Sequence, residues 1–119
     1  MSDDAFREVK QVMENYVKSV ETLDFELMRS LAHEDGRIYI GNTSTSKNLH
    51  DHWKGDEERF KTMDIDEWKK KLSVKILSIQ VEGTIANVKI RMGNWYDFHN
   101  LVKTPEGWKL VTKVSHKIE

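Results

Sequence analysis

The stretch NWYDFHNLVKTPEGWKLVTKVSH, residues 94–116, decides the fold. It consists of two runs rich in apolar residues, joined by Thr104-Pro105-Glu106-Gly107. Proline at the second position and glycine at the fourth position are typical of a type I turn. The stretch therefore predicts a β-hairpin, and its first strand carries Asp97 and His99, the pair most suited to chemistry.

The segment before this hairpin predicts a second one. Residues 74–81 and 84–92 flank Glu82-Gly83, which is a hairpin turn signal. In the later run every second residue is apolar, as expected for a strand with one buried face: Ala86, Val88, Ile90 and Met92. Gly93-Asn94 then leads into the next strand, so the sequence predicts a meander of four antiparallel strands.

The first third of the chain predicts helices. Residues 5–20 have apolar side chains at spacings of three and four, which indicates an amphipathic helix. A second helix is expected over residues 25–32, with Asp24 as its N-cap and Asp35-Gly36 after its end. Residues 64–72 predict a short third helix, because Asp64 and Glu67 have the spacing of a capping box.

Between these helices the pattern is weaker. Residues 37–40 predict a short strand with Ile38 and Ile40 on one face and Tyr39 on the other. Residues 48–61 are highly charged, and their pattern assigns no element. Because helices precede an antiparallel sheet, we expect one α+β domain over residues 1–119 in which the helices cover one face of a curved sheet.

Composition excludes several classes of protein. The net charge is −1, so the basic excess usual in nucleic-acid binding is absent. There is no cysteine, which excludes disulfides and thiolate metal sites. The beginning, MSDDAF, lacks the basic and then apolar order of a signal peptide, and no apolar run has the length of a membrane span. We expect a cytoplasmic protein with neither nucleic-acid nor membrane partners.

Three segments resemble the nuclear transport factor 2-like superfamily: YDFHNLVK at 96–103, EGWKLVTKV at 106–114 and VEGTIANVKI at 81–90. Within it the chain is most similar to the SnoaL-like and "putative lumazine-binding" families. The resemblance implies a cone-like, cystatin-like fold in which the N-terminal helices pack on the concave face of a curved antiparallel sheet. It also implies a small-molecule pocket at the wide end of the cone and a homodimer formed through the sheet.

Asp97 is the leading candidate for chemistry, since aspartate is disfavoured in the middle of a strand unless it is solvated or functional. Its direction depends on the hairpin register. A two- or four-residue loop places Asp97 opposite Val114. A three-residue loop places it opposite Ser115, on one face with His99 and Lys113, and pairs apolar residues with each other better. In an apolar pocket its pKa would rise, and the carboxyl group could act as an acid or a base.

Other candidates surround this pair. His99 shares the face of Asp97 and Trp95, so the sequence proposes Asp97 and His99 as catalytic residues and Trp95 as a pocket wall. Tyr16 and Tyr39 are the other expected walls. Tyr16 also resembles the first-helix tyrosine of ketosteroid isomerases, but residues 37–41, RIYIG, contain no carboxylate to serve as the base of that branch.

No cofactor or metal is predicted. His50 and His52 form an H-x-H pair, but two imidazoles are too few for a metal site and no third ligand is evident. The sequence also lacks HExxH, G-x-S-x-G, phosphate-loop and dinucleotide signatures.

Two functions follow from the sequence. The first is a small-molecule-binding pocket protein, or a cofactor-independent enzyme of the isomerase, dehydratase or hydrolase type. The second is a non-catalytic dimerisation or protein-interaction module of the same fold. No complete catalytic set is visible, so the sequence leaves enzyme status open.

Overall fold

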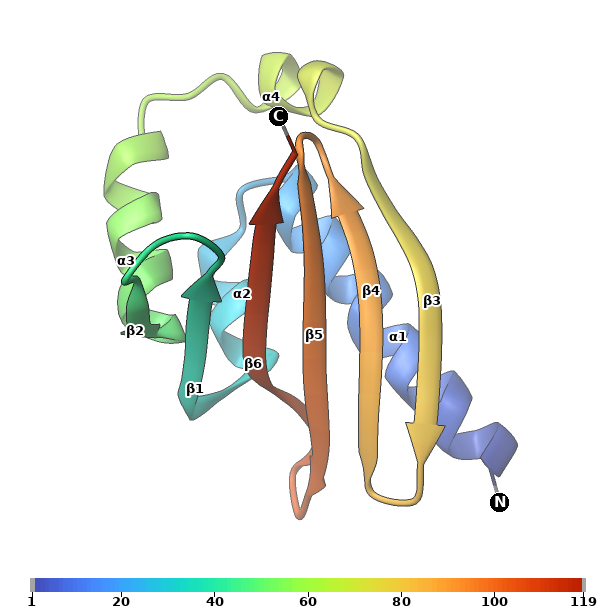
Figure 1. Ribbon diagram of the computed structural model, residues 1–119. Coiled ribbons are helices and arrows are strands. Elements are labelled where there is room, and N and C mark those ends of the chain that lie inside the picture. The colour runs from blue at the N-terminus through green and yellow to red at the C-terminus, as the bar shows by residue number, and fades with distance from the viewer. Residues whose placement is uncertain (1, 119) are drawn as a thin grey trace.

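The computed structural model describes residues 2–118, so Met1 and Glu119 of the expected domain lie outside it. Four helices pack against a six-stranded sheet whose strand order is β2-β1-β6-β5-β4-β3 (Figure 1). The helices are α1 Ser2–Glu21, α2 Phe25–Ser30, α3 Leu49–Phe60 and α4 Ile65–Lys71. The strands are β1 Ala32–Ile40, β2 Ser46–Asn48, β3 Val74–Glu82, β4 Ile85–Met92, β5 Trp95–Thr104 and β6 Gly107–Lys117.

The predicted meander is confirmed, but the sheet is mixed rather than purely antiparallel. Strands β3 to β6 pair in sequence order, each antiparallel to the next. Strand β1 runs parallel to β6. The meander leaves one edge of β6 free, and β1 enters along that edge from the helical side. No local turn joins these two strands, so the sequence carried no signal for their relative direction.

Strand β1 is longer than expected. It begins at Ala32, where the second helix was predicted to continue, and that helix ends at Ser30. The Asp35-Gly36 pair does not close the helix but lies inside the strand, where the register with β6 shifts. A β-carbon on Gly36 would come 3.1 Å from the carbonyl oxygen of His33, so glycine suits this close approach.

The closing hairpin combines features of both expected registers. Its loop has two residues, because Thr104 pairs with Gly107. That loop alone would place Asp97 opposite Val114. A bulge intervenes, since Asn100 pairs with Thr112 whereas Leu101 pairs with Leu110, and it shifts Asp97 to a position opposite Ser115.

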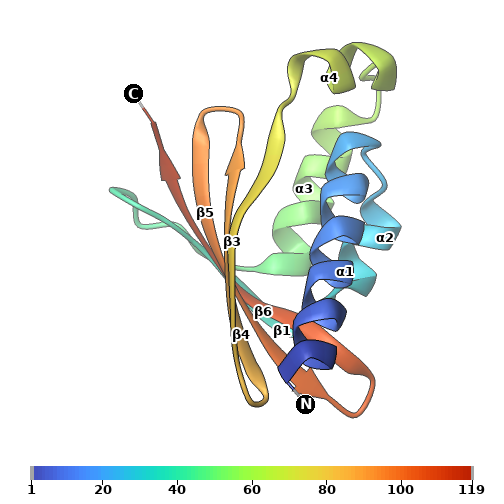
Figure 2. The ribbon, with the colours of Figure 1, turned by 90° about the vertical axis from the view of Figure 1, so that its right-hand side faces the viewer.

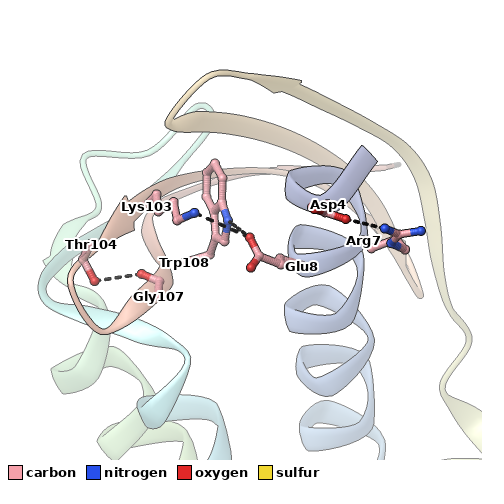
Figure 3. Close-up of polar contacts among 7 residues, drawn as sticks. All are labelled: Asp4, Arg7, Glu8, Lys103, Thr104, Gly107 and Trp108. Atoms are coloured by element: carbon pink, nitrogen blue, oxygen red, sulfur yellow. Dashed lines mark hydrogen bonds and ion pairs between the residues drawn. The ribbon is translucent and has the colours of Figure 1, made fainter. Parts of the chain in front are cut away.

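The tip of this hairpin is tied to the first helix (Figure 3). The indole nitrogen of Trp108 donates to Glu8 Oε1 over 3.2 Å, and Lys103 Nζ lies 3.8 Å from the same oxygen. Within the loop, the Thr104 hydroxyl donates to the Gly107 carbonyl over 2.7 Å. The contacts of Trp108 and Lys103 with Glu8 link the closing hairpin to α1.

Residues 48–61, which the sequence left without an element, contain α3. The side chain of Asn48 accepts a hydrogen bond from the Asp51 amide and caps the helix. Its apolar anchors Leu49 and Trp53 are fully or almost fully buried. The capping role predicted for Asp64 in α4 is confirmed, because its carboxylate accepts from the amide of Glu67.

The helices all lie on one side of the curved sheet, and the opposite face is uncovered (Figure 2). The core forms between them from residues of α1, α2, α3 and the inward face of the strands, including Val9, Met13, Ile38, Val88, Ile90 and Leu110. None of the helices within residues 2–118 is both long and apolar enough to cross a lipid bilayer.

Candidate functional site

A cavity of about 540 Å³ opens between the helices and the end of the sheet where β4 turns into β5. Aromatic side chains supply much of its wall: Trp53, Phe60, Trp68 and Trp95. Tyr16, Asp97, Lys113 and Ser115 supply polar atoms at its inner end. A larger hollow of about 660 Å³ lies at the opposite end of β3, β4 and β5. We take the smaller cavity as the candidate site, because buried ionisable groups line it.

The inner end of the cavity holds a cluster of buried polar side chains from three elements. Tyr16 comes from α1, Asp97 and His99 from β5, and Lys113 from β6. Lys113 Nζ donates to Tyr16 Oη over 3.2 Å and lies 3.8 Å from Asp97 Oδ2. On the other side of the carboxylate, His99 Nε2 lies 3.9 Å from the same oxygen. The His99 ring meets Tyr16 edge-on, with 4.9 Å between ring centroids.

Most of the hydrogen-bonding capacity of this cluster is unused. Both carboxylate oxygens of Asp97 and both ring nitrogens of His99 are buried and have no hydrogen-bond partner among residues 2–118. The two contacts of Asp97 Oδ2 are ion-pair distances and too long for hydrogen bonds. Leaving a buried polar group unpaired costs about 1–3 kcal/mol, so such groups usually serve a purpose.

The cluster carries one negative and one positive charge at neutral pH. Burial raises the pKa of Asp97, but His99 and Lys113 outweigh burial and leave this pKa below its usual range, so the expected rise in an apolar pocket is wrong. Burial also opposes the charge of Lys113, but Tyr16 and Asp97 outweigh it, so the pKa of the amine is raised. Burial lowers the pKa of His99 and raises that of Tyr16, so both rings are neutral.

A second polar group, from α3, lies at the mouth of the cavity. His52 Nε2 lies 3.4 Å from Asp56 Oδ2, and Arg59 also contacts the Asp56 carboxylate. Burial lowers the pKa of His52 to about 4, helped by the positive charges of Lys113, Arg59 and Lys47. The neighbouring His50 is used differently, since its Nε2 lies 3.1 Å from the carbonyl oxygen of Ala32.

These two histidines do not converge on a common site. His50 is directed to the β1 backbone and His52 to the mouth of the cavity. Within the part of the chain that the structure describes, no group of three metal-binding side chains occurs.

The structure brings some of the predicted site residues together and separates others. Asp97, Tyr16 and Trp95 all line the cavity. His99 is fully buried behind Asp97 and is not part of the cavity wall. Tyr39 as a wall is wrong: it lies on the outer face and is 43% exposed, because strand alternation turns it away from Ile38.

Two contributors to the site were missed by sequence reasoning. Lys113 was noted only as sharing a face with Asp97 in one of the registers, although it is the only cation at the inner end of the described cavity. Trp53 was not recognised because it lies in the charged segment 48–61, to which the sequence pattern assigned no helix or strand. Its spacing of four from Leu49 was the one available signal, because both positions fall on one face of a helix.

Acid should destabilise the fold before Asp97 is protonated. His52 and His99 are neutral in the folded protein, whereas in the unfolded chain their pKa lies near 6.5. As the pH falls below 6.5, the unfolded state takes up protons that the folded state does not, and the free energy of unfolding decreases. We expect a loss of at most about 1.4 kcal/mol per pH unit for each histidine, measured by urea denaturation.

A pair of variants measures how much His52 contributes to the pH dependence of the free energy of unfolding. His52→Gln should make the pH dependence shallower, because the variant has lost one of the two histidines whose pKa is lowered by burial. His116→Gln, on the exposed outer face, should leave the slope unchanged. Equal slopes for wild type and His52→Gln would contradict the assignment.

Comparison with known proteins identifies the family. The profile of the family described as "Putative lumazine-binding" matches residues 4–116. No protein of curated function matched the chain.

Solved structures share the fold at low sequence identity. An NTF2-like protein of unknown function from Shewanella baltica OS155 is 17% identical, with a TM-score of 0.76 over 100% of this chain and 98% of that one. One from Methylobacillus flagellatus KT is 21% identical, with a TM-score of 0.72 over 98% and 94%. A ketosteroid isomerase-like protein from Erwinia carotovora atroseptica SCRI1043 is 13% identical, with a TM-score of 0.73 over 96% of both chains. Because the family profile covers almost the whole chain, the protein belongs to the family described as "Putative lumazine-binding", and its fold is shared with solved NTF2-like proteins.

Proposed function

We propose that the protein binds a small molecule in the cavity between the helices and the sheet. The observation that carries this proposal is the combination of mostly apolar walls with buried, unpaired polar atoms at the inner end. Ligand sites are typically apolar cavities with a few convergent polar groups, and the volume of about 540 Å³ is within their usual range. The description of the family, which refers to a small heterocycle, supports the same class of function.

We propose further that the cluster can transfer protons without a cofactor. Asp97 is a carboxylate with free acceptor positions, as a general base requires. Tyr16 accepts a hydrogen bond from Lys113 and keeps its own proton to donate to a ligand oxygen. His99 supports Asp97 from behind and has the role of a positioning residue. This arrangement suits an isomerase, a dehydratase or a hydrolase whose substrate loses a proton next to a polar oxygen.

A binding experiment with a blocked cavity tests the proposal. The probes are naphthalene-sized fragments, 2-naphthol, 2-quinolinone and 1-tetralone, titrated into the protein while tryptophan fluorescence is recorded. Ile40 lines the cavity, so Ile40→Trp should fill it and weaken binding at least tenfold. Ile85→Trp is the matched control, because Ile85 is exposed at the far end of the sheet. Equal binding by both variants, or no binding by any fragment, would reject the proposal.

The outer face of the sheet favours self-association. Tyr39, Val114 and Phe98 pair across β1, β6 and β5 and form one apolar row, and each is more than 40% exposed. Next to this row, Lys89 Nζ lies 5.8 Å from the centroid of the Phe98 ring. Contiguous exposed apolar side chains on a sheet mark interaction surfaces. We propose that two copies of the chain pair through this face, and the same face would serve the alternative function of an interaction module.

A charge placed in the apolar row should prevent this pairing. Phe98→Lys removes a central apolar side chain and adds a second cation beside Lys89. We expect the variant to be monomeric at concentrations where the wild type is a dimer, measured by sedimentation equilibrium. Ile65→Lys is the control, since Ile65 is similarly exposed but lies on α4. A monomeric wild type, or a dimer that survives Phe98→Lys, would show that this face is not the interface.

The proposed partners are therefore a small-molecule ligand and a second copy of the chain. A nucleic-acid or membrane partner is not proposed. The cytoplasmic location that the sequence favours stays a prediction.

A further inference from the structure

We infer that the inner end of the cavity binds a ligand group that carries a hydrogen-bond donor and an acceptor side by side, as in the N–H and C=O of a lactam. The inference rests on the proposed function, because it names the class of ligand that the same cavity would take. It follows from the arrangement of Asp97 and Lys113, which offer an acceptor and a donor next to each other.

The first step of the argument is the unused capacity of Lys113. An ammonium group has three N–H donors. Among the described residues, its hydrogen bond goes to Tyr16 Oη, and the carboxylate of Asp97 is too distant at 3.8 Å to accept one. The ammonium is therefore charged, buried and able to donate to a further acceptor that reaches the inner end of the cavity.

The second step concerns Asp97. Its carboxylate is 1% exposed, and neither oxygen accepts a hydrogen bond from the described residues. Asp97 and Lys113 both line the cavity, so a ligand can reach both. A ligand that satisfies the pair must donate to the carboxylate and accept from the ammonium at the same time.

The third step uses the charges. The carboxylate and the ammonium compensate each other, so a ligand bearing only an anion would face Asp97, and one bearing only a cation would face Lys113. A neutral group with a donor and an acceptor on adjacent atoms avoids both repulsions. A simple ketone would satisfy Lys113 but leave the carboxylate unpaired, which a buried charge tolerates poorly.

The walls complete the description of the ligand. Trp53, Trp95 and Phe60 present aromatic surface to the cavity above the polar end. Aromatic walls favour a planar, apolar body through stacking and edge contacts. The ligand class is therefore a planar ring system with a lactam edge, bound with this edge toward β5 and β6.

Three matched ligands test the inference on the unmodified protein. 2-Quinolinone has the lactam edge, 1-methyl-2-quinolinone lacks the N–H donor, and 3-methyl-2-quinolinone keeps the donor and has the same size as the N-methyl compound. Hydrogen bonds to charged groups are worth enough that the N-methyl compound should bind at least about tenfold more weakly than the other two. The dissociation constants are measured by isothermal titration calorimetry.

Two variants of the full chain test whether the preference for the N–H compound depends on Asp97. Asp97→Ala removes both acceptor oxygens, so the ratio of the affinities for the N–H and N-methyl compounds should fall toward one. His116→Gln, on the outer face, should keep the wild-type ratio. Because each ratio is measured within one protein sample, a loss of folded material cannot imitate the result.

The outcomes separate the two proposals. If the three ligands bind equally well, the cavity binds small molecules as proposed but the donor–acceptor inference is overturned. If the N-methyl compound is selectively weak and Asp97→Ala abolishes the difference, the inference is supported, whereas a difference that persists in Asp97→Ala overturns it. If none of the three ligands or the naphthalene-sized fragments binds, the proposed function fails and the inference fails with it.

Discussion

Replacing Lys113 by methionine should lower the free energy of unfolding by about 3–5 kcal/mol, because it leaves the buried carboxylate of Asp97 without a counter-charge. Among residues 2–118, Lys113 Nζ is the one cationic group near this carboxylate, at 3.8 Å, and His99 on its other side is neutral. Methionine has nearly the length of lysine, so the change removes charge with little loss of volume. The measurement is urea denaturation at pH 7.

The double variant provides the critical comparison. Asp97→Leu combined with Lys113→Met removes both charges, and replacing a buried ion pair by apolar residues is often neutral or stabilising. The double variant should therefore be more stable than Lys113→Met alone. The exposed pair Glu58–Lys61, with 3.1 Å between charged atoms, is the control, because removing it should cost less than about 1 kcal/mol. Additive losses in the double variant would show that Asp97 and Lys113 act independently.

The stability loss caused by Lys113→Met should depend on pH in a definite direction. In the wild type the pKa of Asp97 is lowered, so the ion pair stabilises the fold above pH 3.8 and this contribution is lost as the pH falls through the lowered value. Without Lys113 the carboxyl group loses a cause of that lowering. The penalty of Lys113→Met should thus shrink in acid, where Asp97 can bind a proton and become neutral.

The local elements of this fold could be predicted because their signals lie within short windows. The apolar spacing of α1, the turn at Glu82-Gly83 and the cap at Asp64 each involve residues that are neighbours in sequence. The facing of Asp97 could not be predicted in the same way. It depends on a bulge opposite Asn100, and neither strand carries a residue that requires a bulge there.

Contacts between distant segments explain the other errors. The parallel pairing of β1 with β6 joins residues that are more than 70 positions apart, and no turn specifies its direction. Sequence reasoning missed Lys113 as a site residue for a related reason. A lysine on a strand is typical of a surface position, and only the bulge and the helix above it enclose the side chain of Lys113 against Tyr16.

The charged segment 48–61 was the largest region without an assigned element, and its buried anchors lead to a second large stability prediction. Helix α3 has few buried side chains, so most of its attachment to the core depends on Leu49 and Trp53. Trp53 is 2% exposed, and its ring lies 6.1 Å from that of Tyr16 and 6.2 Å from that of His50. A helix held by so few contacts should loosen when one of them is lost.

Trp53→Ala should therefore lower the free energy of unfolding by about 3–5 kcal/mol, a large fraction of the total stability of a domain of this size. Hydrogen exchange should show faster exchange of the α3 amides, while the central strands β4 and β5 keep their relative protection. Trp53→Phe should cost less, because it keeps an aromatic ring in the cavity wall. Phe6→Ala is the control, since Phe6 is 41% exposed on α1. Because Trp53 lines the cavity as well as the core, Trp53→Ala should also weaken fragment binding. If the variant is as stable as the wild type and its α3 amides exchange at the same rate, the charged face of this helix, rather than its buried tryptophan, holds it against the sheet.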